Sequence, residues 1–179
     1  MRLQGVIMAS NLIIYYSRKG QNYFSGNIRD IPKGNTEYVA EFIHDAVGGD
    51  LFEIDTVEPY PVDYMECTEV AKDELRAKKR PELKRYIDDI SSYDNVFVCG
   101  PCWWGTYPMA VFSQLERLDW EGKKVFPVMT HEGSGLGSCE RDLKNACKGA
   151  DVRRGLAVSG GQASSSQKKV AEWAKNSIQ

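Results

Sequence analysis

The first candidate segment, near the N-terminal end and in two parts, gathers residue types that bind phosphate. Ser17, Lys19 and Gly20 follow an apolar run, and Asn35 and Thr36 begin a helical pattern. Hydroxyl groups, an amide, a lysine and the free N–H groups of a helix N-terminus suit a phosphate group when they lie together. An ordinary helix N-cap at Asn35 or Thr36 is the alternative interpretation, since Asn and Thr are common at that position.

The segment 101–108 combines large aromatic rings with residues that shape the backbone. It reads Pro101-Cys102-Trp103-Trp104-Gly105-Thr106-Tyr107-Pro108. Adjacent tryptophans in a loop either cover the core or stack on something planar. The flanking glycine and prolines favour a planar ligand or partner over core packing.

A glycine-rich segment follows the next apolar run. It reads Thr130-His131-Glu132-Gly133-Ser134-Gly135-Leu136-Gly137. Its glycines let backbone amides approach a ligand closely, although a solvated mobile loop is an equally good interpretation. We expect His131 to form hydrogen bonds rather than to transfer a proton, and we assign no residue a catalytic role.

The cysteines offer a second kind of chemistry. Cys99-Gly100-Pro101-Cys102 matches the redox tetrapeptide of thioredoxins. This interpretation is disfavoured because Cys99 ends an apolar strand, where a buried thiol is usual, and because a loop intervenes before the next helix. Cys139 and Cys147 lie on an apolar helical stripe without a partner at zinc-ligand spacing, so we expect core positions and no metal site.

These segments are separated by elements that would position them. Apolar and β-branched runs predict buried strands over residues 11–16, 50–56, 95–100, 124–130 and 152–158. Helical spacing of apolar residues predicts helices over residues 36–47 and around 70–75, 111–115, 136–147 and 170–174. This alternation predicts an α/β fold with a parallel sheet that helices cover on both faces.

Two segments exceed a minimal repeat of strand and helix. Residues 21–33 are rich in Asn, Ser, Gly and aromatic residues and form an insertion beside any ligand at the first strand end. Residues 57–93 hold a helix, the basic run 76–80, Pro81 and a short second helical piece. We interpret the basic run as a solvated helix end rather than as a binding patch.

Length and composition set the remaining limits. The 179 residues fit one domain, 11–179, after a short N-terminal extension, 1–10. The net charge of −2 provides no basic field for a phosphate backbone, so we expect no nucleic-acid partner. Five cysteines without a signal peptide predict a reducing, cytoplasmic location, and no apolar run has transmembrane length. The oligomeric state stays open.

Together the three segments resemble the flavodoxin family, especially a bacterial flavodoxin-like subgroup with a Pro-x-Trp-Trp-Gly loop. The resemblance extends from residue 11 to the last helix. It implies a doubly wound three-layer sandwich of parallel strands in the order 2-1-3-4-5. It also implies FMN as the cofactor of an electron-transfer protein that serves redox partner proteins. The alternatives are an NAD(P)H-dependent FMN oxidoreductase of the quinone-reductase type and, without flavin, a C-x-x-C thiol redox protein.

The resemblance assigns a role to each candidate residue. The residues implied for the phosphate are Ser17, Lys19, Gly20, Asn35 and Thr36. The residues implied for the flavin ring are Pro101, Cys102, Trp103, Trp104, Gly105, Thr130, His131, Gly133 and Gly135, with Trp103 or Trp104 stacked on the ring. Residues 21–33 split the compact phosphate loop that the family normally has. We therefore expect this insertion to fold over the phosphate or the ring, using Tyr23 or Phe24.

Overall fold

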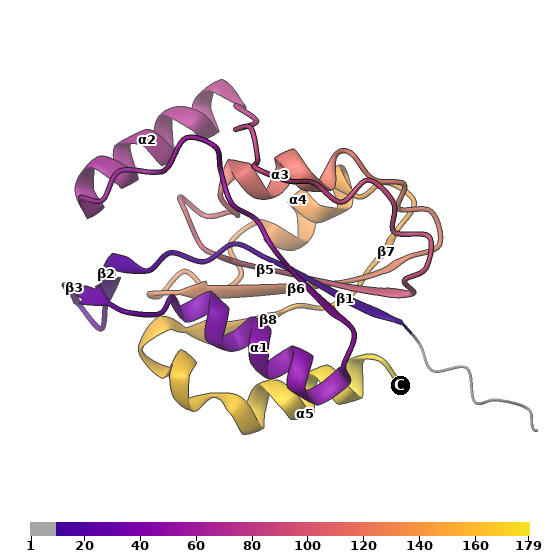
Figure 1. Ribbon diagram of the computed structural model, residues 1–179. Helices are drawn as coiled ribbons and strands as arrows, with labels where there is room; N and C mark the ends of the chain where they lie inside the picture. The colour runs from indigo at the N-terminus through magenta and orange to yellow at the C-terminus, as the bar shows by residue number, and fades with distance from the viewer. Residues whose placement is uncertain (1–9) are drawn as a thin grey trace, which may run out of the picture.

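A six-stranded parallel sheet forms the middle layer of the molecule (Figure 1). The computed structural model describes residues 10–179, so residues 1–9 of the expected extension lie outside the described part. The strands are β1 (Asn11–Tyr15), β4 (Asp50–Glu53), β5 (Asn95–Pro101), β6 (Lys124–His131), β7 (Asp151–Val152) and β8 (Leu156–Ser159). They are arranged as β4-β1-β5-β6-β7, with β8 also paired to β6, and all pairs are parallel. With β7 and β8 counted as one position, the expected order 2-1-3-4-5 is confirmed.

The fifth strand position differs from the prediction of one continuous strand over residues 152–158. Val152 pairs with Val125 and Leu156 pairs with Val128, so three residues of the edge segment face two residues of β6. One of these two is Pro127, which has no backbone N–H to offer a neighbouring strand. The edge segment therefore bulges beside Pro127 and splits into β7 and β8.

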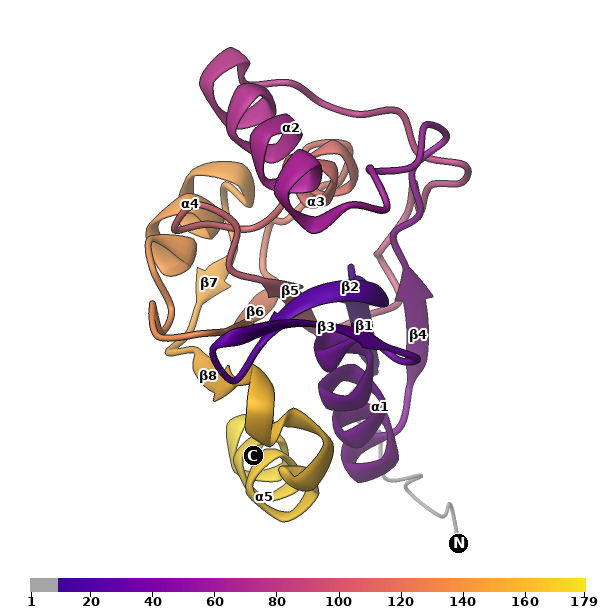
Figure 2. The same cartoon turned by 90° about the vertical axis from the view of Figure 1, so that its left-hand side faces the viewer.

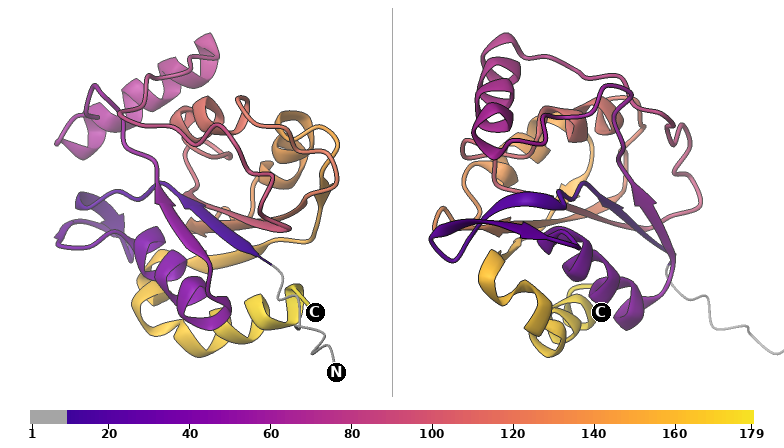
Figure 3. Two further views of the ribbon diagram at one scale, coloured as in Figure 1. Left: turned by 45° about the vertical axis from the view of Figure 1, so that its right-hand side comes forward. Right: turned by 60° about the vertical axis from the view of Figure 1, so that its left-hand side comes forward.

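Helices cover both faces of the sheet (Figures 1 and 3). On one face lie α1 (Asn35–Val47) and α5 (Gln167–Ser177), the latter preceded by the 3₁₀ helix η1 (Gly160–Ser165). On the other face lie α2 (Tyr64–Ala77), α3 (Met109–Leu115) and α4 (Cys139–Ala146). The expected three-layer sandwich is therefore observed, with α2 farther from the sheet than α3 and α4 (Figure 3).

Two apolar clusters hold these layers together. Ile13, Val39 and Phe97 belong to the cluster between the sheet and the α1–α5 layer. Leu12, Val98 and Leu143 belong to the cluster on the opposite face. Successive residues of β1 contribute to opposite clusters because side chains alternate along a strand. All five residues of β1 are buried, so the strand ends that carry the candidate loops are firmly placed.

The insertion after β1 forms a β-hairpin rather than an irregular loop. Strands β2 (Gly20–Phe24) and β3 (Asn27–Ile31) pair antiparallel in a sheet of their own. Ser25 and Gly26 connect them with positive φ angles of 50° and 89°, the arrangement of a tight two-residue hairpin turn. Figure 2 shows the hairpin across the end of the central sheet. The prediction that residues 21–33 lie beside the first strand end is thus confirmed.

The predicted second helical piece after Pro81 is wrong, because residues 78–94 form no helix. This segment instead bonds to neighbouring elements through its backbone. The Gln114 side chain, fully buried in α3, accepts from the Ile87 N–H at 2.9 Å and donates to the Ile87 carbonyl at 2.8 Å. The Lys84 N–H donates to the Asp55 carbonyl at 2.9 Å. Because these backbone groups are bonded to other elements, they are not available for the hydrogen bonds of a helix.

Within residues 10–179, no helix combines the length and the apolar character needed to cross a membrane.

Candidate functional site

The loops that follow β1, β5 and β6 meet at the carboxyl edge of the sheet, where open parallel sheets bind ligands. A cavity of about 150 Å³ lies between them, and the segment after β8 also reaches it. Its lining consists of Asn22, Tyr23, Asn35, Tyr64, Pro101, Cys102, Trp103, Thr130, His131, Glu132, Ser134 and Gly160. The structure thus brings members of all three candidate segments together.

The N-terminus of α1 has free hydrogen-bond donors. The helix N-cap is Gly34, which forms no side-chain cap, so neither Asn35 nor Thr36 is the cap. The Ser17 hydroxyl accepts the Glu37 N–H at 3.0 Å. The backbone N–H groups of Asn35 and Thr36 find no acceptor among the described residues. These amides and the helix dipole form an anion-binding end beside Ser17.

The hairpin does not separate Ser17 and Arg18, which precede it, from Gly34, which follows it. At Gly34, a Cβ would lie 2.0 Å from the Ser17 Oγ and 2.8 Å from the Arg18 carbonyl oxygen. Only a residue without a side chain allows this close approach. The residues before and after the hairpin therefore meet as in an uninterrupted loop. The insertion does not keep the two parts of the expected phosphate loop apart.

Other phosphate candidates are placed differently. The Thr36 hydroxyl is buried and lies 2.8 Å from the Thr130 hydroxyl. The hydroxyl therefore faces Thr130, and the backbone N–H of Thr36 is the donor that has no acceptor among the described residues. Lys19 is exposed, and Gly20 begins β2. Neither residue lines the cavity at the sheet edge.

The segment 101–108, which we call the tryptophan loop, contains a tight turn and two tryptophans in different environments. Trp103 and Thr106 pair through backbone hydrogen bonds, with Trp104 and Gly105 between them at φ angles of 56° and 87°. Positive φ is ordinary for glycine but strained for tryptophan. Trp104 is exposed to 52%, whereas Trp103 is half-buried. Only Trp103 lines the cavity at the sheet edge.

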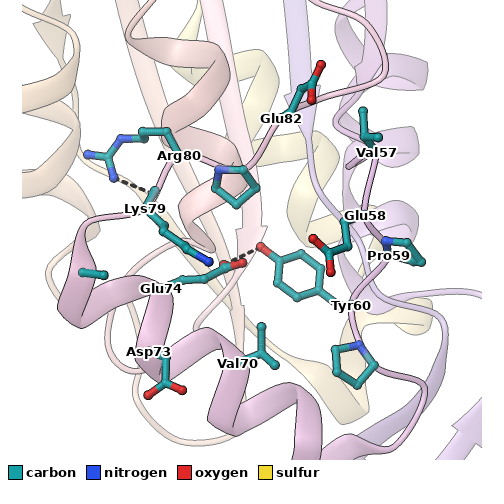
Figure 4. A pocket seen from close by; sticks show the side chains of 13 residues that line it. Val57, Glu58, Pro59, Tyr60, Val70, Asp73, Glu74, Lys79, Arg80 and Glu82 are labelled. Carbon is teal, nitrogen blue, oxygen red and sulfur yellow. Dashed lines mark hydrogen bonds between the residues drawn. The ribbon is translucent and has the colours of Figure 1, made fainter.

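Packing against tyrosines fixes the ring of Trp103. It meets the rings of Tyr16 and Tyr60 edge to face, with centroid distances of 5.3 and 5.0 Å. The Tyr60 hydroxyl donates to a carboxylate oxygen of Glu74 at 2.7 Å (Figure 4). Burial raises the pKa of Tyr16, Tyr60 and Glu74, and the bond from Tyr60 partly offsets this for Glu74. Trp103 is thus a preset wall of the cavity.

Hydrogen bonds connect the end of the glycine-rich loop, residues 130–137, to the tryptophan loop. The Ser138 N–H donates to the Gly105 carbonyl at 2.7 Å. The Asp142 carboxylate accepts hydrogen bonds from the Thr106 hydroxyl at 2.7 Å and from the Ser138 hydroxyl at 2.5 Å. Asp142 stands on α4, outside every candidate segment of the sequence. Its contacts set the spacing of the two loops.

His131 and Glu132 form hydrogen bonds within the protein. The Nδ1 atom of His131 accepts the Gly133 N–H at 2.9 Å, which places the proton of the neutral ring on Nε2. The structure is consistent with the expected hydrogen-bonding role of His131. Glu132 is exposed, and its carboxylate accepts the Ser25 N–H from the hairpin turn at 3.2 Å. Gly133 and Gly135 belong to the loop but not to the lining of the cavity.

The hairpin closes one side of this edge. Arg18 holds its base by donating to the carbonyls of Gln21, Pro61 and Val62, each at 2.9 Å. The rings of Tyr23 and Tyr64 stack with centroids 6.2 Å apart. Tyr23 lines the cavity, as expected for one of the two named aromatic residues, whereas Phe24 does not.

The cysteine tetrapeptide does not form a dithiol site. Cys99 is fully buried in the cluster on the α1–α5 face, whereas the half-buried Cys102 packs against the opposite cluster. Burial raises the pKa of Cys99 far above its usual range. All five cysteines are free. Cys139 and Cys147 are buried core residues as expected, and burial raises the pKa of each to about 12.

Sequence reasoning missed several residues of the site. Asn22, Tyr64 and Gly160 line the cavity, and Asp142 supports it. Gly160 directly follows β8, so the rule that ligands lie beyond strand ends could have found it. Tyr64 and Asp142 depend on contacts between distant segments, for which the chain carries no local signal.

A larger cavity of about 670 Å³ lies elsewhere, between α2 and the segments 57–61 and 79–82 (Figure 4). Charged side chains such as Glu58, Asp73 and Lys79 line much of it. It shares no lining residue with the cavity at the sheet edge. We therefore place the candidate site at the sheet edge, where the sequence motifs meet.

Comparison with known proteins identifies the family of the chain. The family model described as Flavodoxin matches residues 22–177, whereas no curated protein matches the chain. Among solved structures, the chain is similar to a proposed flavoprotein from Bacteroides uniformis ATCC 8492, with a TM-score of 0.74 and 24% identity over 93% of this chain and 98% of that chain. A proposed flavoprotein from Bacteroides eggerthii DSM 20697 gives a TM-score of 0.73 and 26% identity over 94% and 97%.

A third similar structure is a flavoprotein from Lactobacillus acidophilus NCFM in complex with FMN. Its TM-score is 0.64, with 20% identity over 91% of this chain and 99% of that chain. Likeness at this identity concerns the fold, whereas the family match spans most of the chain. This chain belongs to the flavodoxin family.

Proposed function

We propose that the chain binds one FMN at the carboxyl edge of the sheet and transfers electrons with it. The observation that carries the proposal is a single juxtaposition. The free donors at the N-terminus of α1 and the fixed ring of Trp103 border the same edge, one suited to phosphate and the other to a flat ring system. Family membership and the FMN complex of the Lactobacillus acidophilus flavoprotein agree with this choice of cofactor.

The phosphate would bind at the start of α1. Asn35 and Thr36 supply backbone N–H groups, and Ser17 supplies a hydroxyl. Lys19 contributes charge near the loop rather than a wall of the cavity. These donors fit a dianionic group because, within residues 10–179, none of them has a negatively charged partner.

The flavin ring would bind beside Trp103. The backbone N–H groups of Trp104 and Gly105 find no acceptor among the described residues, so they can donate to the polar edge of the ring. Bound FMN supplies the capacity to take up and release electrons. Trp103 supplies a planar wall, and Asp142 holds the tryptophan loop at a fixed distance from the glycine-rich loop.

The visible absorption spectrum tests cofactor binding. The purified protein is mixed with excess FMN and passed through a gel-filtration column. We expect the yellow chromophore to elute with the protein at about one FMN per chain. A colourless protein peak would contradict the proposal, provided that circular dichroism shows a folded chain.

Two roles are consistent with bound FMN, and anaerobic addition of NADPH or NADH separates them. A carrier that serves redox proteins would keep its absorption near 450 nm, because it takes electrons from another protein. Rapid bleaching would favour the alternative, an NAD(P)H-dependent oxidoreductase. We propose the carrier as the primary role.

A further inference from the structure

The cavity at the sheet edge is smaller than the ligand proposed for it. Its volume is about 150 Å³, whereas pockets that bind small molecules commonly measure about 300–1,000 Å³. An FMN molecule therefore fits at this edge only after one wall of the cavity has moved. The walls differ in how firmly the fold holds them.

The hairpin, residues 20–31, is the wall that the fold holds least firmly. Strands β1, β5 and β6 run through the buried centre of the sheet, and Trp103 is packed against two tyrosines. No residue of the hairpin belongs to either apolar cluster of the core, and β3 is exposed along most of its length. Segments with few buried apolar contacts open at a low cost in free energy. Movement of the hairpin is therefore the least costly way to enlarge the cavity.

Hydrogen bonds anchor the base of the hairpin. The Arg18 guanidinium donates to the carbonyls of three residues, Gln21, Pro61 and Val62, each at 2.9 Å. The Gln21 side chain accepts the Tyr64 N–H, also at 2.9 Å. These bonds join the base to the start of α2 and to the segment before it, so the base is the natural position for a hinge.

The tip of the hairpin reaches the opposite side of the cavity (Figure 2). The Ser25 N–H donates to the Glu132 carboxylate at 3.2 Å, which is near the long limit for such a bond. Gly161, in η1, comes so close that a Cβ there would lie 2.4 Å from the Ser25 Oγ. This hydrogen bond and this contact, which together we call the latch, hold the tip in its closed position.

We propose that the hairpin is a lid, which opens at the latch to admit FMN and closes to retain it. The proposal rests on the proposed function, since the lid has a ligand to retain only if FMN binds at the sheet edge. Opening breaks the bond from Ser25 to Glu132 and the stacking of Tyr23 on Tyr64, while the Arg18 bonds hold the base. Lids of this kind set the rates at which a ligand enters and leaves.

A disulfide across the latch tests the lid. A Cβ at Gly161 would lie 3.7 Å from the Ser25 Cβ, within the range of about 3.5–4.5 Å that is typical of disulfides. The double variant Ser25→Cys/Gly161→Cys is loaded with FMN, oxidised with diamide and diluted, and the recovery of flavin fluorescence gives the release rate. We expect release to be about tenfold or more slower from the oxidised than from the reduced double variant. Oxidation before FMN is added should slow uptake in the same way.

The unmodified protein, treated with the same oxidant, is the control for oxidation of the natural cysteines. Its rates of FMN uptake and release should be the same before and after treatment. A change in these rates equal to that of the double variant would overturn the lid, because the effect would then not come from the latch.

Two substitutions of Glu132 test the latch without a new covalent bond. Glu132→Ala removes the acceptor of the Ser25 N–H, whereas Glu132→Gln keeps an acceptor oxygen. Both variants remove the same charge, so the difference between them reports the hydrogen bond. Release of FMN should be about twofold or more faster from Glu132→Ala than from Glu132→Gln.

Three further results would overturn the inference. Equal rates for the oxidised and the reduced double variant would show that FMN exchanges without movement of the tip. A double variant that forms no disulfide while FMN is bound would show that the tip does not close over the ligand. Equal release from Glu132→Ala and Glu132→Gln would overturn the latch at Glu132. Failure of the unmodified protein and the reduced double variant to take up FMN would contradict the proposed function instead.

Discussion

The hydroxyl groups of Thr36 and Thr130 lie 2.8 Å apart and join the start of α1 to the end of β6. Both residues are buried, with 2% and 4% of their surface exposed. They are 94 positions apart in the sequence, so the bond connects two of the three candidate segments from inside the protein. We therefore expect Thr36 to serve the proposed phosphate site through its position and its backbone N–H.

A double-mutant cycle tests this connection. Thr36→Val or Thr130→Val alone should lower the free energy of unfolding by about 1–3 kcal/mol, because each leaves a buried hydroxyl without its partner. The double variant should cost clearly less than the sum, since both polar groups are then replaced by methyl groups. Urea denaturation measures all four proteins. Additive losses would show that the two hydroxyls do not interact.

Asp142 should act as a positioning residue for the tryptophan loop. Asp142→Ala removes the acceptor of the Thr106 and Ser138 hydroxyls and should cost about 1–3 kcal/mol of stability, because Thr106 is buried. FMN affinity, measured by fluorescence quenching, should also fall, because the tryptophan loop is then held less firmly. Asp142→Asn, which keeps an acceptor oxygen, should recover part of both losses. Unchanged stability and affinity in Asp142→Ala would contradict this role.

The thiols should differ in reactivity. Cys102 is half-buried, whereas Cys99 is fully buried and has a raised pKa. A thiol reagent such as 5,5′-dithiobis(2-nitrobenzoate) should therefore modify Cys102 first. Cys99 should react only when the protein unfolds. The variant Cys102→Ser should lose the early phase of the reaction. A disulfide between Cys99 and Cys102 in the folded protein, detected by mass spectrometry, would revive the thiol alternative.

Glu74 should make stability depend on pH. Burial raises its pKa above the ordinary value of 4.5, so the folded state holds the proton more tightly than the unfolded state. This contribution to stability is complete below pH 4.5 and is lost as the pH rises through the folded-state pKa. In Glu74→Gln the amide oxygen can still accept a hydrogen bond from the Tyr60 hydroxyl. Because the amide does not titrate, this variant should not show the loss of stability at higher pH.

Urea unfolding between pH 4.5 and 8 measures the effect. The free energy of unfolding of Glu74→Gln should fall less across this range than that of the unmodified protein. Asp73→Asn serves as the control, because Asp73 is an exposed acid on the same helix beside the same cavity. Parallel pH profiles for Glu74→Gln and the unmodified protein would rule out the proposed contribution.

The central sheet could be predicted because its middle strands, β1, β5 and β6, are buried on both faces. After an initial asparagine, β1 and β5 are runs of mainly apolar residues, as is typical of strands that helices cover on both faces. The hairpin was not predicted, because β3 is largely exposed and carries polar residues such as Asn27, Arg29 and Asp30. Its only local signal is the two-residue turn at Ser25 and Gly26.

The meeting of the three loops at one sheet edge could be predicted better than the bonds between them. The three loops share an edge because parallel strands bring their carboxyl ends together, which the order of elements already implies. The partner of the Thr36 hydroxyl and the edge-on packing of Trp103 depend on which distant side chains arrive there. Such contacts carry no periodicity and no spacing in the sequence, so they become visible only in the folded chain.

The comparison of FMN with riboflavin tests the central claim most directly, because the two ligands differ only in the phosphate. Each is titrated into the folded chain, with quenching of flavin fluorescence as the signal. If the free donors beside Ser17 hold the phosphate, FMN should bind about tenfold or more tightly than riboflavin, and Ser17→Ala should narrow that difference. Equal affinities for the two flavins, or no binding of either, would contradict the account.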